Sequence, residues 1–520
     1  MPAALTYPGV YVEEIPSGVR TIAGVSTSDT AFVDFFRRGP LNQAQRITSF
    51  GDFERVFGGL DTRSDASYAI QQYYRNGGTV AWVVRVAAGS PQAAALAVPG
   101  AAPAGSPFRA QAASPGTWGN SLQVAITSAP VAGQFNLFVR EVATVSGVQQ
   151  VVASEAFRNL SNDPASSRNA LAVVNAGSLL LRLSEPVAEA APTAAAPTPS
   201  GGAPEAAFAN LSGGTDGNPP DANALIGNEA QKTGLFALDR IQPFVFNLLA
   251  IPAAARFSTA SYTNVYTAAE SYCEARRAFL IVDVPESVGT AAEMTTFVGN
   301  VDGLRHQNAA IYFPRLRIPD PLNENRPRNV AASGTLAGVF ARTDATRGVW
   351  KAPAGTDADL RGATPVVTLN DQENGGLNPL GVNVLRTFPI FGSVCWGGRT
   401  LDGADQQASE WKYISVRRTA LYVEESLFQG LKWVVFEPND EPLWAQIRLN
   451  VGAFMQNLFR QGAFQGKSPA EAYFVRCDKE TTTQNDIDRG VVNILVGFAP
   501  LKPAEFVIIR IQQIAGQVAA

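Results

Sequence analysis

Two apolar segments near the ends of this chain constrain its fold most strongly. Residues 505–514 read EFVIIRIQQI and place apolar side chains on both faces of a strand. Residues 7–15 read YPGVYVEEI, are rich in β-forming residues and carry a Pro-Gly turn signal. A strand that is apolar on both faces must be covered on both, and its free edge can pair with another chain.

Two interpretations of these ends remain open. Each end can close a sheet inside its own domain, or it can add a strand to a sheet of another copy of the chain. The second interpretation predicts that apolar side chains of the two segments act as arms between subunits. These arm residues are Val10, Val12, Ile15, Phe506, Ile508 and Ile511.

The composition fits an ordinary globular protein with 46% hydrophobic residues and room for about three domains in 520 residues. A net charge of −4 argues against nucleic acid as a partner, because nucleic-acid-binding domains are basic. No apolar run approaches the ~20 residues that span a bilayer, and the first residues do not resemble a signal peptide, so no membrane insertion is expected. Three isolated cysteines (Cys273, Cys395 and Cys477) fit synthesis in a reducing cytoplasm.

Two stretches rich in Ala, Pro, Gly and Ser, residues 87–107 and 185–206, are expected to be linkers or loops. Between them, strand-like runs at 122–127 and 135–139 predict a small β-rich domain. We therefore expect an inserted outer domain at residues 91–230.

The flanks of this insert show strands alternating with helices. Alternation of this kind is typical of a parallel sheet with right-handed crossovers. It predicts one α/β domain made of residues 20–90 and 231–349. Its expected strands are 30–36, 79–86, 244–251, 278–284 and 309–313, and its expected helices are 65–74, 263–277 and 290–307.

Residues 350–520 are expected to form a third unit, so that the whole chain is a multidomain α/β (mixed α+β) protein. Apolar residues from Leu443 to Leu458 recur on one face of a long helix that ends at Gly462. Ser468 and Glu471 have the spacing of a capping box for a short helix. Strands are expected at 431–437, 473–477 and 491–498.

No group of residues predicts a catalytic, cofactor or metal site. The segment GAFQGKS at 462–468 resembles a phosphate-binding loop, but Gln461 stands where the first glycine is required. His306 is the single histidine, which excludes a multi-histidine metal site and favours a helix-end or surface role. The cysteines lack metal-ligand spacing, and the pairs Glu13-Glu14 and Glu424-Glu425 are expected to be solvated or ion-paired.

A set of motifs occurs in a fixed order along nearly the whole chain. They are PGVYVEEI (8–15), SFGDFERVFGG (49–59), NGGTVAWVVRV (76–86), DATRGVWKAPAG (344–355), GVNVLRTFPIFGSVCWGGRTL (381–401), WVVFEPND (433–440) and KPAEFVIIRIQQ (502–513). In this order they resemble the contractile tail sheath proteins of phages and of phage-tail-like injection particles.

The resemblance implies a structural subunit rather than an enzyme. Such a subunit polymerises helically around an inner tube and contracts to drive the tube through a target envelope, powered by stored assembly energy. The implied partners are other copies of the chain, the tube protein, and baseplate and terminator proteins, with no cofactor. The resemblance also implies that the protein is made in the cytoplasm of the producing bacterium and is then assembled into a tail or injection particle. The alternative is a cytosolic α/β enzyme with an unrecognised site.

The resemblance also implies that residues 350–520 face the tube and that an N-terminal arm, residues 1–19, joins this inner domain. The contacts between sheath and tube must be stable before contraction and must break during contraction. Exposed charges suit this task, because exposed pairs contribute only ~0–1 kcal/mol each and are weakened by salt. The tube-facing candidates are Arg460, Lys467, Glu471 and Lys479.

Overall fold

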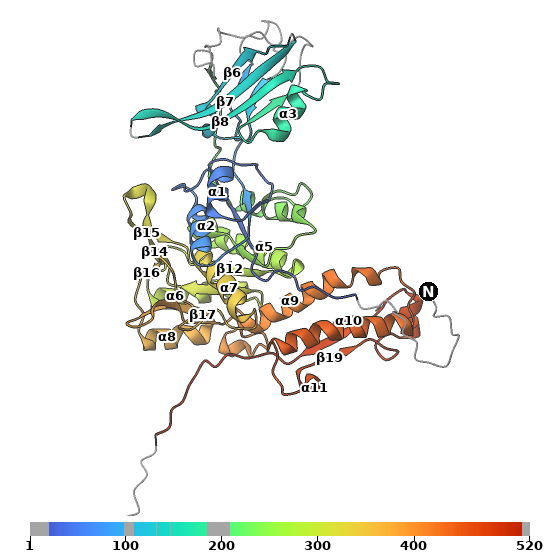
Figure 1. Ribbon diagram of the computed structural model, residues 1–520. Coiled ribbons are helices and arrows are strands. Elements are labelled where there is room, and N and C mark those ends of the chain that lie inside the picture. Colours follow the sequence, from blue (N-terminus) through green and yellow to red (C-terminus); the bar gives the residue numbers. More distant parts are fainter. Residues whose placement is uncertain (1–19, 98–108, 132, 146, 185–207, 512–520) are drawn as a thin grey trace, which may run out of the picture.

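The computed structural model describes residues 20–97, 109–131, 133–145, 147–184 and 208–511. These residues form a central α/β body, a β-rich part above it in Figure 1, and a helical part below it. The mixed α/β fold expected from the sequence is confirmed. None of the described helices combines the length and apolarity needed to cross a membrane.

The central body is built on a sheet that has eight strands in the described residues. Most of them are parallel, and β17–β18 and β2–β3 pair antiparallel at the two edges. In spatial order the strands are β18 (Gly392–Cys395), β17 (Val382–Phe388), β13 (Ala309–Phe313), β12 (Phe279–Val282), β11 (Leu248–Ala250), β1 (Thr30–Asp34), β3 (Ala81–Arg85) and β2 (Gln45–Ile47).

Helices cover both faces of this sheet. The helices α2 (Asp65–Arg75) and α7 (Ser333–Arg347) pack on one face, where Tyr73 and Phe340 join the apolar core around Phe32. The helices α5 (Thr259–Ala275) and α6 (Ala291–Asn300) pack on the other face. This double covering explains the continuous apolar strands, because a parallel sheet is buried on both faces.

Local sequence sets the helix starts in this body. Ser64 caps α2 by accepting a hydrogen bond from the backbone N–H of Ser67, and Thr290 with Glu293 forms a capping box at α6. Smaller elements complete the body. They are α1 (Phe50–Phe57), α4 (Ala222–Ile226), α8 (Asp371–Leu377) and the hairpin β14 (Leu316–Asp320), β15 (Arg326–Val330), which β16 (Thr364–Pro365) extends.

The β-rich part has its own apolar core around Val124, Leu137 and Trp118. One sheet has the order β10-β6-β7-β8 and the other the order β4-β5-β9, with α3 (Ala170–Gly177) packed beside them. The strands are β4 (Ala95–Ala97), β5 (Arg109–Ala112), β6 (Leu122–Ser128), β7 (Gln134–Val145), β8 (Val148–Ser161), β9 (Leu181–Ser184) and β10 (Ala209–Asn210).

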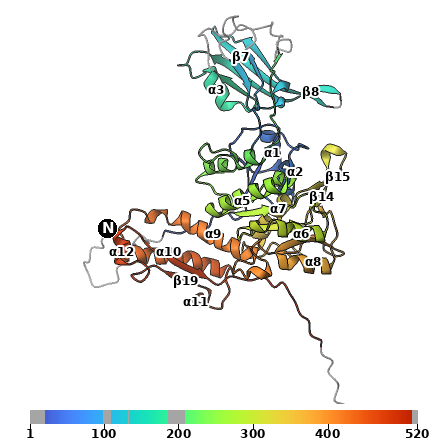
Figure 2. The same cartoon turned by 180° about the vertical axis from the view of Figure 1, so that it is seen from behind.

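The helical part consists of α9 (Ile414–Gly430) and α10 (Glu441–Arg460), which lie side by side in Figures 1 and 2. Asp440 caps α10 by accepting from the N–H of Leu443, and Ile447, Val451 and Phe454 are buried along its apolar face. The expected long helix is therefore confirmed. The remaining elements are α11 (Pro469–Ala472), β19 (Tyr473–Arg476), α12 (Gln484–Asp488) and β20 (Leu495–Phe498).

Four sequence-based expectations need correction. Residues 431–437 are not a strand, because the chain turns through a short 3-10 helix, Lys432–Val434, between α9 and α10. Ser468 makes no side-chain cap at α11, so the capping box is not formed. Part of the expected loop 87–107 is strand β4, because residues 95–97 find a partner in β5 and pair with it antiparallel. Residue 350 is not a boundary, because β17 and β18 belong to the central sheet.

Candidate functional site

The C-terminal segment, residues 501–511, runs away from the body as extended chain (Figures 1 and 2). Phe506, Ile508 and Ile511 are 76%, 79% and 93% exposed. A strand was expected from residue 505 onward, but the described residues 505–511 form none. The apolar segment is therefore uncovered within a single chain.

A buried arginine holds the root of this segment. Arg399, 1% exposed, donates from Nε to Oε1 of Glu505 at 2.7 Å and from Nη2 to Oε2 at 2.8 Å. Tyr413 donates its hydroxyl to the same carboxylate at 3.3 Å. A two-point guanidinium–carboxylate contact of this kind is both directional and strong. It anchors the segment at Glu505, directly before its exposed apolar side chains.

The central sheet positions Arg399. Asn383 of β17 accepts from the backbone N–H of Arg399 at 2.7 Å and donates its side-chain amide to the carbonyl of Arg399 at 2.7 Å. Arg399 also donates from Nη1 to Oδ1 of Asp405 at 2.9 Å. Burial alone would raise the pKa of Glu505, but the hydrogen bonds and charge of Arg399 lower it below its ordinary value. Glu505 is thus held as a carboxylate.

Open strand edges lie in the same part of the molecule. Among the described residues β19 and β20 form a two-stranded antiparallel sheet, Tyr473 opposite Phe498 and Arg476 opposite Leu495. One face of this sheet packs on the α10 core through Val475 and Val496. The outer edge of such a pair presents backbone N–H and C=O groups that can bond to a further strand.

The described chain begins beside the same helices. The backbone N–H of Arg20 donates to Asn450 of α10 at 3.0 Å, and Ile22 is buried in the core that α10 forms. The N-terminal arm candidates Val10, Val12 and Ile15 lie outside the described residues.

The four tube-facing candidates are all exposed and lie around the end of α10 and the start of β19. Arg460 ends α10, and the carboxylate of Glu471 accepts from the backbone N–H of Lys467 at 2.9 Å. Lys479 follows β19 in a turn. Within the part of the chain that the structure describes, no ion pair involves the side chains of Arg460, Lys467 or Lys479.

The residues considered for chemistry lie apart from one another. In the loop after α10, Gln461 caps the helix and Gly462 has a φ of +79°, so the loop follows a helix as expected. His306 lies 3.5 Å from Glu274, and its Nδ1 accepts from the N–H of Asn308. The three cysteines are buried free thiols. The described residues contain no group of three His, Cys, Asp or Glu side chains suited to a metal ion.

Two residues of this region were missed by sequence reasoning. Arg399 follows two glycines in the segment WGGRT, and nothing in this local pattern indicates that its side chain forms a buried ion pair with Glu505. Phe436 is 101% exposed with a φ of +69°, in the turn where a strand was expected. No local pattern reveals that its aromatic ring points into solvent.

Comparison with known proteins gives the same picture. Residues 406–514 match the model of the phage tail sheath C-terminal domain. A putative prophage major tail sheath protein of Pseudomonas aeruginosa is 28% identical over 246 residues, which are 46% of this chain and 59% of that protein. The tail sheath protein of Vibrio phage KVP40 is 26% identical over 321 residues, 57% of this chain and 45% of that protein. The matches thus span about half the length of these curated relatives.

Solved structures share the fold over nearly the whole chain. The sheath of an extracellular contractile injection system in the contracted state has a TM-score of 0.59 at 20% identity, over 98% of both chains. The contracted helical sheath of the anti-feeding prophage has a TM-score of 0.56 at 23% identity, over 98% of this chain and 100% of that one. A sheath tail protein of Listeria innocua has a TM-score of 0.59 at 12% identity, over 92% and 96%.

The resemblance to contractile tail sheath proteins that the sequence predicts is confirmed by these matches. They do not support the alternative of a cytosolic enzyme with an unrecognised site.

Proposed function

We propose that this chain is the structural subunit of a contractile sheath that surrounds an inner tube. The observation that carries the proposal is an apolar C-terminal segment that is exposed in one chain and anchored at its root by the ion pair of Arg399 and Glu505. Covering this segment requires a second copy. The named relatives are tail sheath proteins, and the shared fold supports the same assembly for this chain.

The arms join neighbouring subunits by strand addition. Residues 506–511 of one copy pair with the open edge of the β19–β20 sheet of another, and residues 1–15 reach a third. The contacts are head to tail, because a helical assembly repeats one heterologous interface. A network of anchored, extended arms keeps the lattice connected while the folded bodies change their relative orientation.

The domains divide the work along the radius of the assembly. We place the region of α9, α10 and β19–β20 next to the tube, the α/β body in the middle and the β-rich insert outside. The exposed candidates Arg460, Lys467, Glu471 and Lys479 contact the tube. The lattice partners beyond the tube are a baseplate at one end and a terminator at the other.

Contraction releases energy that assembly stored, and the chain performs no catalysis. A difference of only a few kcal/mol per subunit between extended and contracted lattices is the usual scale of conformational equilibria, and it adds over many copies. No nucleotide is needed. The subunit is made in the cytoplasm of the producing bacterium and works in a phage tail or a tail-like particle.

Electron microscopy of the chain produced with its tube protein tests the proposal. We expect tubular helical assemblies, which contract in the absence of ATP. A variant lacking residues 1–15 should stay folded by circular dichroism and monomeric by size exclusion. A requirement for added ATP, or a wild-type chain that never polymerises with its tube protein, contradicts the proposal.

A further inference from the structure

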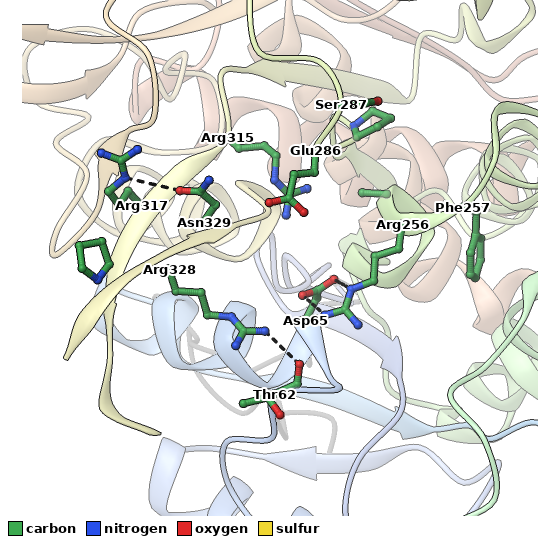
Figure 3. Close-up of a pocket in the computed structure, with 13 residues that line it drawn as sticks. Thr62, Asp65, Arg256, Phe257, Glu286, Ser287, Arg315, Arg317, Arg328 and Asn329 are labelled. Carbon is green, nitrogen blue, oxygen red and sulfur yellow. Dashed lines mark hydrogen bonds and ion pairs between the residues drawn. The ribbon is translucent and has the colours of Figure 1, made fainter. Parts of the chain in front are cut away.

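A hollow of about 860 Å³ lies at the edge of the central sheet where the parallel strands end (Figure 3). It is lined by the start of α2 with the loop before it, by the segments that follow β11, β12 and β13, and by the β14–β15 hairpin. A volume of this size is typical of small-ligand sites. Among its lining residues are Arg256, Arg315, Arg317 and Arg328 and the acidic residues Asp65 and Glu286.

The topology places this hollow at a switch point of the sheet. After β1 the chain forms β2 and β3, both on one side of β1, whereas after β11 it continues to β12 on the other side. In open α/β sheets the crevice at the carboxyl ends of two such strands is the preferred place for ligands. Asp34 fixes one wall by accepting from the N–H of Ala66 at 2.8 Å, and Asp283 fixes another by accepting from the N–H of Ser333 at 2.8 Å.

Two of the four arginines are already engaged. Arg256 forms an ion pair with Asp65. Arg328 donates to the carbonyl of Thr62 at 3.0 Å and to Asp320 at 3.3 Å. Figure 3 shows that these two arginines reach the hollow from different segments.

The other two arginines have no carboxylate within ion-pair distance among the described residues. Arg315 is 8% exposed, donates from Nη1 to the carbonyl of Val284 at 3.0 Å, and has no hydrogen-bond partner at its buried Nε. Among the described residues, the side chain of Arg317 makes one hydrogen bond, from Nε to Oδ1 of Asn329 at 3.5 Å. Asp283 interacts with Arg315 electrostatically but forms no ion pair with it, so an anion in the hollow would give this nine-tenths-buried guanidinium a direct partner.

We propose that this hollow binds a small multivalent oxyanion of the phosphate or polycarboxylate class. Arg315 and Arg317 supply positive charge that no direct ion pair takes up within the described part of the chain, and the planar guanidinium group matches the oxygen geometry of such anions. Glu286 has no ion pair among the described residues and opposes the anion at the rim. The inference is independent of sheath assembly.

Calorimetric titration of the full-length chain with sodium pyrophosphate and, separately, with citrate tests the proposal, against sodium chloride at matched ionic strength. We expect saturable binding of at least one anion, and the comparison of the two distinguishes phosphate from polycarboxylate ligands. Arg317→Gln, at an exposed position, should weaken binding about tenfold, and Arg315→Gln at least as much. Glu286→Gln should tighten binding, because it removes the opposing charge.

Arg326→Gln is the matched control, since Arg326 lies on the same hairpin, pairs with Glu324 and does not line the hollow. It should bind the anion as the wild type does. Circular dichroism of each variant separates lost binding from lost folding. Absence of saturable binding by the wild type, an equal loss in Arg326→Gln, or weaker binding by Glu286→Gln overturns the proposal.

Discussion

Two apolar segments of this chain have similar sequences and opposite environments. Strand β13 reads AAIYF, and its central residue Ile311 is 1% exposed. The C-terminal segment reads FVIIRI over residues 506–511, and its Ile508 is 79% exposed.

The difference lies in where the covering partners come from. In β13, Ile311 belongs to the core on one face of the sheet and Tyr312 to the core on the other, while β12 and β17 pair with both edges. All of these partners are in the same chain. The C-terminal segment has an anchor at Glu505 but no cover. An apolar sequence therefore indicates that a segment will be buried against something. Whether it is buried by its own chain or by another molecule depends on the rest of the fold.

Matched charge insertions should produce the largest effect. Ile311→Asp should collapse the monomer, because an unpaired carboxylate in a doubly covered strand costs several kcal/mol, a large part of typical domain stability. Ile508→Asp and Ile511→Asp should leave circular dichroism and the size-exclusion volume unchanged while abolishing polymers in electron micrographs. A collapsed monomer in Ile508→Asp supports closure of the segment within its own chain instead.

The second test uses a buried carboxyl group on α5. The pH dependence of stability that this group causes measures how unfavourable a charge is in the buried core. Glu270 is buried, and its Oε1 has no hydrogen-bond partner. Burial raises its pKa from 4.5 to about 8. The folded state therefore binds a proton that the unfolded state has lost, and this contribution to stability is complete below pH 4.5 and is lost as pH rises through 8.

Glu270→Gln should thus be more stable than the wild type at pH 8.5 relative to pH 5, by roughly 2–4 kcal/mol. Urea unfolding at the two pH values measures the difference. Glu229→Gln is the control, since this side chain is exposed and forms no ion pair among the described residues. Equal pH dependence in Glu270→Gln and the wild type would show that burial does not raise the pKa of Glu270 above its unfolded value.

The sequence predicts the internal part of this comparison well. Thr30–Asp34 and Ala309–Phe313 are strands within the expected runs, and each is buried along its whole length; Asp65 opens a helix because Ser64 caps it. The sequence does not predict structure that depends on contacts between residues distant in the chain. Residues 431–437 are as rich in β-forming residues as a strand, but they join two helices and find no partner.

The ion pair that anchors the C-terminal segment could not be predicted from the sequence either. Arg399 and Glu505 are 106 residues apart, and only the assembled fold reveals that they meet. The arm residues Val10, Val12, Ile15, Phe506, Ile508 and Ile511 remain predictions about a second copy. A single chain supplies their apolar character but not their partner.

Loosening the anchor gives the third prediction. Glu505→Gln removes the charge that Arg399 holds, and an interaction of this kind contributes about 1–2 kcal/mol. Chymotrypsin cleavage after the half-buried Leu501 should then accelerate about tenfold, because the segment opens more often. Cleavage after Phe436, which is fully exposed in the turn between α9 and α10, serves as the internal reference and should not change.

Glu480→Gln, an exposed position beyond β19, should leave both cleavage rates unchanged. Acid should act as the substitution does. Since the pKa of Glu505 is lowered, the contribution of the anchor is complete above the ordinary value of 4.5 and disappears as pH falls through the lower folded value. If Glu505→Gln leaves the ratio of the two cleavages at its wild-type value, the anchor does not restrain the segment.

The smallest effect is expected at the proposed contact with the tube. This contact involves exposed charged residues that belong neither to the buried core nor to the apolar C-terminal segment. Reversing Lys467 and Lys479 together to Glu should leave the monomer fold and tube-free polymers intact, because both side chains are exposed. Exposed charges contribute only ~0–1 kcal/mol each, so the loss appears as fewer extended, tube-filled particles and as greater sensitivity to salt.

Arg109→Glu with Arg158→Glu makes the same change of charge in the β-rich part, far from α10, and should have no effect on tube occupancy. Unchanged tube occupancy and extended length in the Lys467 and Lys479 variant, measured by electron microscopy across a salt series, would place the grip elsewhere on the inner surface.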